Sequence, residues 1–337
     1  CVAQSIWGWP TDADRGSLPH RTAHILMAAK RGLVYKSTGS WYSVRDEQGK
    51  FWNARIKGVL KLDEITSTNP VAVGDWVQLE VEDEEVGTAM ILNIEPRRNY
   101  LHRQSPRHKH QHHIVASNLD QSMLLVTIKN PKTSTGFIDR CLVASEMYHV
   151  SSLIVCNKAD LYGPKELAVF EEWVRVYGGA GYPVLLVSAE TGQGLDDLQA
   201  RLVDKTTLVT GHSGVGKSSL LNRWLPGLNR RTQDVSGWSG KGLHTTTFAE
   251  MFELPNGGKI IDTPGMREFG LVNLERAELS HYFPEMKNRI QSCQFNNCIH
   301  SNEPGCAIKD AVNEGLIHED RYVSYRTILD SFEEESY

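Results

Sequence analysis

Two patterns of apolar and polar positions divide the chain. From Gly32 to about Arg97, short apolar stretches alternate with polar positions between turn residues, and this period of two predicts β-strands. The strand candidates are Gly32–Lys36, Trp41–Arg45, Phe51–Ile56, Asp75–Val81 and Ala89–Ile94. Five strands this short fit a small barrel of the oligonucleotide-binding (OB) type; an SH3-like or other small β-module is the alternative.

From about Ser122 the pattern changes to uniformly apolar runs that alternate with helical stretches. The predicted strands are Met123–Thr127, Ser152–Cys156, Pro183–Val187, Thr206–Thr210 and Lys259–Asp262. The predicted helices are Phe137–Tyr148, Pro164–Tyr177, Leu195–Val203 and Lys217–Leu225. Strands that are apolar on both sides belong to a parallel sheet with helices on both faces.

The same patterns suggest where the domains begin and end. After about Leu274 the sequence is mostly helical, apart from one cysteine-rich loop. We expect a multidomain α/β protein with a leader over residues 1–30, the barrel over 31–97, the parallel-sheet domain over 98–275 and a helical module over 276–337.

Residues 1–26 differ from the rest of the chain. They mix Trp, Pro, Asp and His without a period, and a basic start followed by an apolar run is missing, so they do not form a signal peptide. Met27 is a plausible native start, which makes the preceding residues an added or upstream-translated leader; a genuine disordered tail is the alternative. The chain has no run of about 18 apolar residues, so the sequence predicts no membrane span.

The net charge of -5 argues against a surface that coats nucleic acid everywhere, but the charges are unevenly distributed. Between Lys30 and Leu62 there are eight Lys and Arg residues and two acids. The stretch from Arg97 to His113 has five Lys and Arg, five His and no acid. These counts allow a local basic surface, and they make Arg97–His113 a candidate RNA contact. A solvated linker between barrel and sheet is the alternative for that stretch.

The six cysteines indicate a metal site. Three are isolated, and three lie with a histidine in the pattern Cys293-x4-Cys298-x-His300-x5-Cys306. Three thiolates and one imidazole suit tetrahedral Zn²⁺ in a closed structural site, in a reducing compartment. The alternative is a set of reduced cysteines that pack a small helical domain.

A complete phosphate-loop pattern, Gly211-x4-Gly216-Lys217-Ser218, follows the predicted strand Thr206–Thr210. In such loops backbone amides surround the phosphates, the lysine reaches the β and γ oxygens, and the serine hydroxyl ligates Mg²⁺. The strand before it and the helix after it are the context that the pattern requires; a chance glycine turn is the alternative. The predicted nucleotide contacts here are Gly211, His212, Ser213, Gly214, Val215, Gly216, Lys217, Ser218 and Ser219.

A second motif predicts which base is bound. Asn157-Lys158-Ala-Asp160 follows one predicted strand, and Ser188-Ala189 follows the next. The Asp160 carboxylate can accept hydrogen bonds from the guanine ring NH and exocyclic amine, a donor pair that adenine lacks. The Lys158 stem can lie over the base, and Asn157 supports the loop. A polar turn is the alternative, but the placement after two strands favours GTP over ATP.

The last core motif, Asp262-Thr-Pro-Gly265, ends the final predicted strand. Asp262 would hold the Mg²⁺ shell through water, and the Gly265 amide would contact the γ-phosphate. Met266 follows where many switch GTPases have a glutamine that orients the attacking water. An apolar side chain cannot orient water, so another group must do so or intrinsic hydrolysis is slow.

The loop Gly240-Lys-Gly-Leu-His244-Thr245-Thr246-Thr247 lies between the phosphate loop and the last motif. Thr246 would complete the Mg²⁺ shell when the γ-phosphate is present, with Thr245 as the alternative. His244 is the candidate for positioning water, and a histidine that only packs the loop is the alternative. We therefore expect His244, Lys217 and Thr246 to be the catalytic residues.

The order of these motifs is rotated, because a GTPase normally has its phosphate loop first and its guanine-reading motif near the end. With these residues in place, the chain resembles the circularly permuted, ribosome small-subunit-dependent GTPases of the RsgA (YjeQ) family over about residues 32–330. The resemblance rests on the rotated order, Gly211–Ser219, Gly-Leu-His-Thr-Thr, Asp-Thr-Pro-Gly followed by Met-Arg-Glu-Phe, the Cys-Cys-His-Cys spacing and Asn118-Leu-Asp-Gln121.

The resemblance implies an OB-type barrel that docks on rRNA, a circularly permuted phosphate-loop GTPase and a zinc-binding module. It further implies late maturation of the small (30S) ribosomal subunit in the cytoplasm, contact with 16S rRNA, and GTP hydrolysis that the subunit stimulates. The expected ligands are GTP or GDP, Mg²⁺ and one Zn²⁺ per chain. No feature demands a dimer, so a monomer is expected. The alternatives are a GTP-dependent binding switch with incidental hydrolysis, and a GTPase that acts on another RNA or protein.

Overall fold

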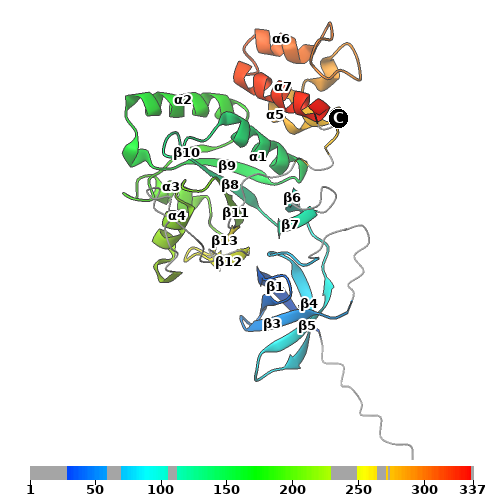
Figure 1. Cartoon of the computed structure of the whole chain (residues 1–337), viewed down its shortest axis with the longest axis vertical. Coiled ribbons are helices and arrows are strands. Elements are labelled where there is room, and N and C mark those ends of the chain that lie inside the picture. Colours follow the sequence, from blue (N-terminus) through cyan, green and yellow to red (C-terminus); the bar gives the residue numbers. More distant parts are fainter. Residues whose placement is uncertain are drawn as a thin grey trace, which may run out of the picture.

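The computed structural model describes residues 29–58, 70–104, 112–228, 249–263, 271 and 274–334. Figure 1 shows a β-barrel and a small helical module at opposite ends of the long axis, with a helix-covered sheet between them. The expected leader falls almost entirely on residues outside the described ones.

The barrel is built from β1 (Lys30–Ser37), β2 (Tyr42–Asp46), β3 (Phe51–Ile56), β4 (Trp76–Asp83) and β5 (Thr88–Ile94). The strands pair in the order β1-β2-β3-β5-β4 and back to β1, with only β3 and β5 parallel. Alternate residues, including Val34, Trp52 and Leu79, are buried inside. The alternating pattern therefore predicted all five strands, and the closed five-stranded barrel is confirmed.

Ion pairs offset the positive charge expected on the barrel. Every Lys and Arg that the structure describes in the basic stretch lies within ion-pair distance of a carboxylate: Lys30, Arg31, Lys36, Arg45, Lys50, Arg55 and Lys57. The partners come mainly from the acidic end of β4, from Glu95 and from a distant strand, β12 (Glu250–Glu253). A count along the sequence therefore overstates the free positive charge of this segment.

The central domain holds the predicted parallel sheet. Its parallel strands, in spatial order, are β10 (Val184–Leu186), β9 (Ser151–Cys156), β8 (Gln121–Val126), β11 (Thr206–Thr210) and β13 (Lys259–Asp262). Leu124 and Val126 of β8 face one core, with the helices α1 (Thr135–Met147) and α2 (Pro164–Gly179). Met123 and Leu125 face the other core, with α3 (Leu195–Ala200) and α4 (Lys217–Trp224). Helices therefore cover both faces of the sheet, as predicted.

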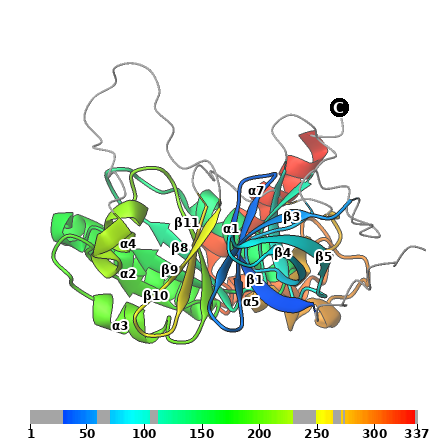
Figure 2. The same cartoon turned by 90° about the horizontal axis from the view of Figure 1, so that it is seen from below.

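One edge of this sheet was not predicted. β12 pairs antiparallel with β13, so the sheet is not wholly parallel. The other edge of β12 meets β1 of the barrel at Lys36 and Glu250, and Figure 2 shows the two strands side by side. Glu253 of β12 also accepts a hydrogen bond from the Tyr35 hydroxyl at 2.5 Å. The barrel is therefore joined to the central sheet through a strand edge and a set of polar contacts.

The chain leaves the barrel through a hairpin of β6 (Tyr100–Gln104) and β7 (His112–Ser117), which pair antiparallel. The C-terminal module contains α5 (Pro284–Lys287), α6 (Ala307–Asn313) and α7 (Glu319–Glu334) around a core that includes Leu279, Phe283 and Tyr325. Its predominantly helical character agrees with the prediction. Within the described ranges, no helix is both long and apolar enough to cross a membrane.

Candidate nucleotide site and metal centre

The rotated motifs meet at one edge of the central sheet. Asn157 directly follows β9, Ser188 comes two residues after β10, Gly211 directly follows β11, and Asp262 ends β13. All four strands are parallel, so their carboxyl ends lie on the same side of the sheet. Ligands of open α/β sheets bind at that edge. The fold thus brings together residues that are up to 105 positions apart in the sequence, from Asn157 to Asp262.

The phosphate loop has the conformation that its glycines permit. Gly211 has φ +148°, and a Cβ there would lie 2.2 Å from the carbonyl oxygen of Leu125. Gly216 has φ +100°, and a Cβ there would lie 2.3 Å from the Asn157 Nδ2 atom. The loop leads directly into α4, whose first residue is Lys217. A helix N-terminus that follows such a loop is an anion-binding arrangement.

Lys217 points back over this loop. Its ammonium group donates hydrogen bonds to the carbonyl oxygens of Gly211 and His212, the latter at 2.7 Å. Burial lowers the pKa of Lys217, and the nearby Asp262 carboxylate partly opposes that shift. A half-buried ammonium group among backbone carbonyls is suited to exchange those contacts for phosphate oxygens.

Asn157 joins three segments of the site. Its side chain is 1% exposed. Nδ2 donates to the Val215 carbonyl at 2.9 Å, and Oδ1 accepts from the Ala189 amide at 2.9 Å. One buried side chain thus ties the phosphate loop to the Ser188-Ala189 turn, which fixes the spacing between the phosphate end and the base end of the site.

Asp160 and Lys158 are the residues predicted to contact the base, and they lie beside Ser188 and Asn130. The Ser188 hydroxyl donates to Asp160 Oδ1, which leaves the second carboxylate oxygen available to a base. Lys158 has φ +68°, a left-handed conformation that is uncommon for a residue with a side chain. Its ammonium group contacts the Asn130 carbonyl, and burial lowers the pKa of Lys158.

The oxygen types of Ser218 and Asp262 are those that suit a magnesium ion. Ser218 lies in the first turn of α4, and the buried Asp262 ends the neighbouring strand β13. Hydroxyl and carboxylate oxygens are the ligand types that Mg²⁺ takes together with substrate phosphates. The remaining predicted contacts, Thr246, His244 and Gly265, lie outside the described residues.

The sequence did not predict one contact of the phosphate loop. The His212 ring packs against Phe137 of α1, with 3.8 Å between ring centroids. Position 212 is a variable position of the motif, and Phe137 comes 75 residues earlier, so no sequence signal joins them. The contact packs α1 against the phosphate loop.

The second site is the cysteine cluster of the helical module. The ligand atoms of Cys293, Cys298, His300 and Cys306 all lie within 4.8 Å of one another. His300 Nδ1 is 3.6 Å from the Cys293 sulfur and 3.4 Å from the Cys306 sulfur. Tetrahedral zinc with bonds of about 2.0–2.3 Å places its ligand atoms about 3.5–3.8 Å apart, so the set fits Zn²⁺ with Nδ1 as the nitrogen ligand.

Protonation at the cluster agrees with this fit. Burial lowers the pKa of His300, which favours the neutral imidazole that a metal ligand requires. Burial among neighbouring thiols raises the pKa of Cys298 to about 12. A metal ion that binds there must therefore displace a proton, which makes its affinity depend on pH.

The basic stretch that was a candidate RNA contact has structural roles over its described part. Arg97 is 8% exposed and forms a bidentate pair with the buried Asp75, at 2.7 Å to each oxygen. His102 is also buried. Residues 105–111, which hold two of the five histidines, lie outside the described ones. Arg97 and His102 are buried, whereas the Arg98 side chain is 59% exposed, and the choice between RNA contact and linker stays a prediction.

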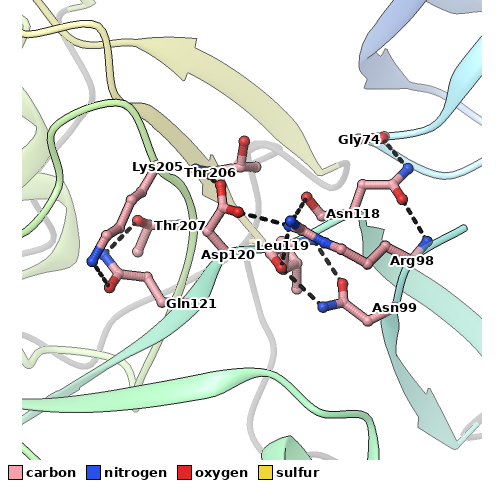
Figure 3. Close-up of polar contacts among 10 residues, drawn as sticks. All are labelled: Gly74, Arg98, Asn99, Asn118, Leu119, Asp120, Gln121, Lys205, Thr206 and Thr207. Carbon is pink, nitrogen blue, oxygen red and sulfur yellow. Dashed lines mark hydrogen bonds and ion pairs between the residues drawn. The ribbon is translucent and has the colours of Figure 1, made fainter.

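Residues Arg98 and Asn99 of that stretch contact the segment Asn118–Gln121 (Figure 3). Arg98 pairs with Asp120 at 2.7 Å, and the other Asp120 oxygen accepts from the backbone amide of Thr206, the first residue of β11. The Asn118 side chain donates to the carbonyl of Gly74 in the barrel at 2.8 Å. The barrel, the hairpin and the first residues of the central strands are therefore held in one polar network.

Comparison with known families agrees with this arrangement. The family model described as RsgA GTPase matches residues 94–272, and the RsgA N-terminal domain model matches residues 31–89. The chain is 48% identical over 307 residues to the small ribosomal subunit biogenesis GTPase RsgA of Bacteroides fragilis, which covers 91% of this chain and 98% of the relative. The RsgA of Christiangramia forsetii is 46% identical over 308 residues, with the same coverage.

Two solved structures are similar along nearly their whole length. YjeQ from Thermotoga maritima superposes with a TM-score of 0.73 at 35% identity, over 90% of this chain and 98% of that one. YloQ, described as a circularly permuted GTPase, gives a TM-score of 0.70 at 28% identity, over 93% and 98%.

Proposed function

Because this chain belongs to the RsgA GTPase family, we propose that it binds the small (30S) ribosomal subunit, assists its late maturation and hydrolyses GTP faster when bound to it. The chain is a GTP hydrolase by family. The observation that best supports the proposal is Asn157, which ties the phosphate loop to the base-reading turn although the motifs occur in rotated order.

The residues take distinct roles in this proposal. The backbone amides of Gly211–Ser219 and the Lys217 ammonium group hold the phosphates. Asp160 reads the guanine edge, oriented by Ser188, with Lys158 over the base and Ala189 holding Asn157 in place. Ser218, Thr246 and Asp262 hold Mg²⁺, which neutralises charge on the phosphate oxygens. Gly265 contacts the γ-phosphate, and His244 positions the attacking water.

The other regions serve docking. The barrel and the basic stretch Arg97–His113 contact 16S rRNA. One Zn²⁺ on Cys293, Cys298, His300 and Cys306 maintains the helical module. The domains divide at about residues 30, 97 and 275. The chain acts as a monomer in the cytoplasm, where the ribosomal subunit is assembled.

The test is GTP turnover with and without purified 30S subunits. We expect slow turnover alone, because Met266 replaces the water-orienting glutamine, and a large increase with subunits. Large ribosomal subunits serve as the control and should have little effect. Tight GTP-dependent binding without faster turnover would instead favour a binding switch. Absence of binding would contradict both functions.

A further inference from the structure

We propose that Tyr162 is a positioning residue for guanine recognition: its hydroxyl holds the turn that presents Asp160 to the base. The inference rests on the guanine site of the proposed function and assigns part of its selectivity to a residue outside the Asn-Lys-x-Asp motif. Tyr162 lies two positions after Asp160 and just before α2.

The hydroxyl joins the ends of two neighbouring strands. It donates to the Asn157 carbonyl at 2.5 Å, and it accepts from the Ile128 amide at 2.9 Å. The Cys156 sulfur lies 3.5 Å away. A tyrosine hydroxyl has one donor and room for two acceptor contacts, so these three neighbours use its full capacity. Burial raises the pKa of Tyr162, so the hydroxyl stays protonated and remains a donor.

The bond to Asn157 bears on backbone strain. The Asn157 carbonyl belongs to the peptide group that leads into Lys158, which has φ +68°. On the other side of Lys158, the Ala159 amide donates to the Val187 carbonyl at 3.0 Å. A left-handed residue with a side chain persists only where its surroundings hold it. Tyr162 and Val187 hold the two peptide groups that flank Lys158, and Asp160 is the residue after Ala159.

The same carbonyl belongs to the residue that spans the site. A shift of the Asn157 backbone would displace the Nδ2 and Oδ1 atoms that contact Val215 and Ala189. Without the hydroxyl, the Ile128 amide would still have the Cys156 sulfur as an acceptor, but the Asn157 carbonyl would lose its donor. The turn is then expected to relax toward water, where that carbonyl regains a partner. Nucleotide binding would then have to restore the turn. The free energy needed for this would reduce the net contribution of the Asp160 contacts to guanine binding.

Tyr162 also packs on the core beside α1 and α2, which offers a purely structural role. The two roles differ in what they predict. Loss of packing lowers stability and leaves base selectivity unchanged. Loss of the turn reduces the advantage of GDP over IDP, which lacks the exocyclic amine that Asp160 accepts from.

The experiment compares Tyr162→Phe with Tyr148→Phe, whose hydroxyl contacts His102 Nε2 at 3.1 Å outside the nucleotide site. Dissociation constants for GDP and IDP are measured by competition with a fluorescent GDP analogue on the full zinc-loaded chain. We expect the GDP-over-IDP preference to fall about tenfold in Tyr162→Phe and to change less than about twofold in Tyr148→Phe. A preference within twofold of wild type in Tyr162→Phe overturns the inference, even if its melting temperature is lower.

A second comparison tests the route through the turn. Glycine adopts the left-handed conformation freely, so in a Lys158→Gly background the Tyr162→Phe change should alter the preference less than about twofold. If Tyr162→Phe still lowers the GDP-over-IDP preference about tenfold in the Lys158→Gly background, the hydroxyl does not act through the left-handed turn. A wild-type chain that did not distinguish GDP from IDP or ADP would overturn the guanine site itself, which is a separate and recognisable outcome.

Discussion

Replacing Arg321 with methionine should loosen the helical module from the central domain. Arg321 lies on α7 with 1% of its side chain exposed. It pairs with Asp139 of α1 and, at 2.6 Å, with Glu285 of α5, and Ser324 donates to Asp139 as well. Methionine keeps most of the side-chain volume and removes the charge, so two carboxylates would remain buried without their cation.

The expected cost follows from that burial. Removing one partner of a buried ion pair costs about 3–5 kcal/mol, whereas whole domains are stable by about 5–15 kcal/mol. Burial already raises the pKa of Asp139 despite the attraction of Arg321, and the variant should raise it further. When folding raises the pKa of an acid, the free energy of unfolding of the protein falls as the pH rises from the unfolded pKa, about 3.9, to the folded pKa. The deficit of the variant is therefore largest at pH 8 and shrinks as the pH falls toward the pKa of Asp139.

The measurement is urea unfolding of the zinc-loaded chain, followed by far-UV circular dichroism. The control is Arg175→Met, whose side chain is 69% exposed and pairs with Glu172, and it should change the unfolding free energy by less than about 1 kcal/mol. Adding Asp139→Asn to Arg321→Met should recover part of the loss, because it removes an unpaired buried charge. If Arg321→Met unfolds like Arg175→Met, the ion pairs do not hold the module in place.

Three further predictions concern the sites. Gly216→Ala should weaken GDP binding by at least about tenfold, because the added Cβ would lie 2.3 Å from the Asn157 Nδ2 atom. The control Gly136→Ala should not weaken binding, because a Cβ at Gly136 meets no atom within 4 Å. Titration with a fluorescent GDP analogue measures both affinities. Chelation should release one zinc per chain and melt the helical module, as measured by metal analysis and circular dichroism, and an unchanged melting curve would argue against a structural zinc. His244→Ala should lower subunit-stimulated turnover about 100-fold with little change in GTP affinity, and unchanged stimulated turnover would remove its catalytic role.

The sequence predicts the central strands well because β8, β9, β11 and β13 are almost wholly buried, although β10 is only partly buried. All six residues of β8 are buried, and a continuous apolar run of this length is typical of a parallel strand that is covered on both faces. β12 was missed because it has four residues, Glu-Met-Phe-Glu, and lies at the sheet edge with charged ends that pair with the barrel. The β6–β7 hairpin was missed because its strands, Tyr-Leu-His-Arg-Gln and His-His-Ile-Val-Ala-Ser, lack a strict apolar–polar alternation, although Leu101 and Ala116 are buried.

The candidate motif residues can be proposed from the sequence because phosphate and guanine require particular groups at fixed spacing. The contacts that hold those groups cannot. Arg321 pairs with Asp139 across 182 residues, and Glu253 meets Tyr35 across 218. The Tyr162 hydroxyl acts on backbone atoms, which carry no sequence signal of their own. Pairings of this kind depend on the folded arrangement, so they become visible only in three dimensions.

The most direct test of the account is turnover by Asp160→Asn with xanthosine triphosphate in the presence of small ribosomal subunits. In the proposed function Asp160 accepts hydrogen bonds from the guanine edge, and an asparagine there can instead donate to the carbonyl that xanthine has in place of the amine. The account predicts that the variant loses preference for GTP, hydrolyses the xanthosine nucleotide and is stimulated by the subunits. A variant that still prefers GTP, or whose turnover of the xanthosine nucleotide ignores the subunits, would contradict it.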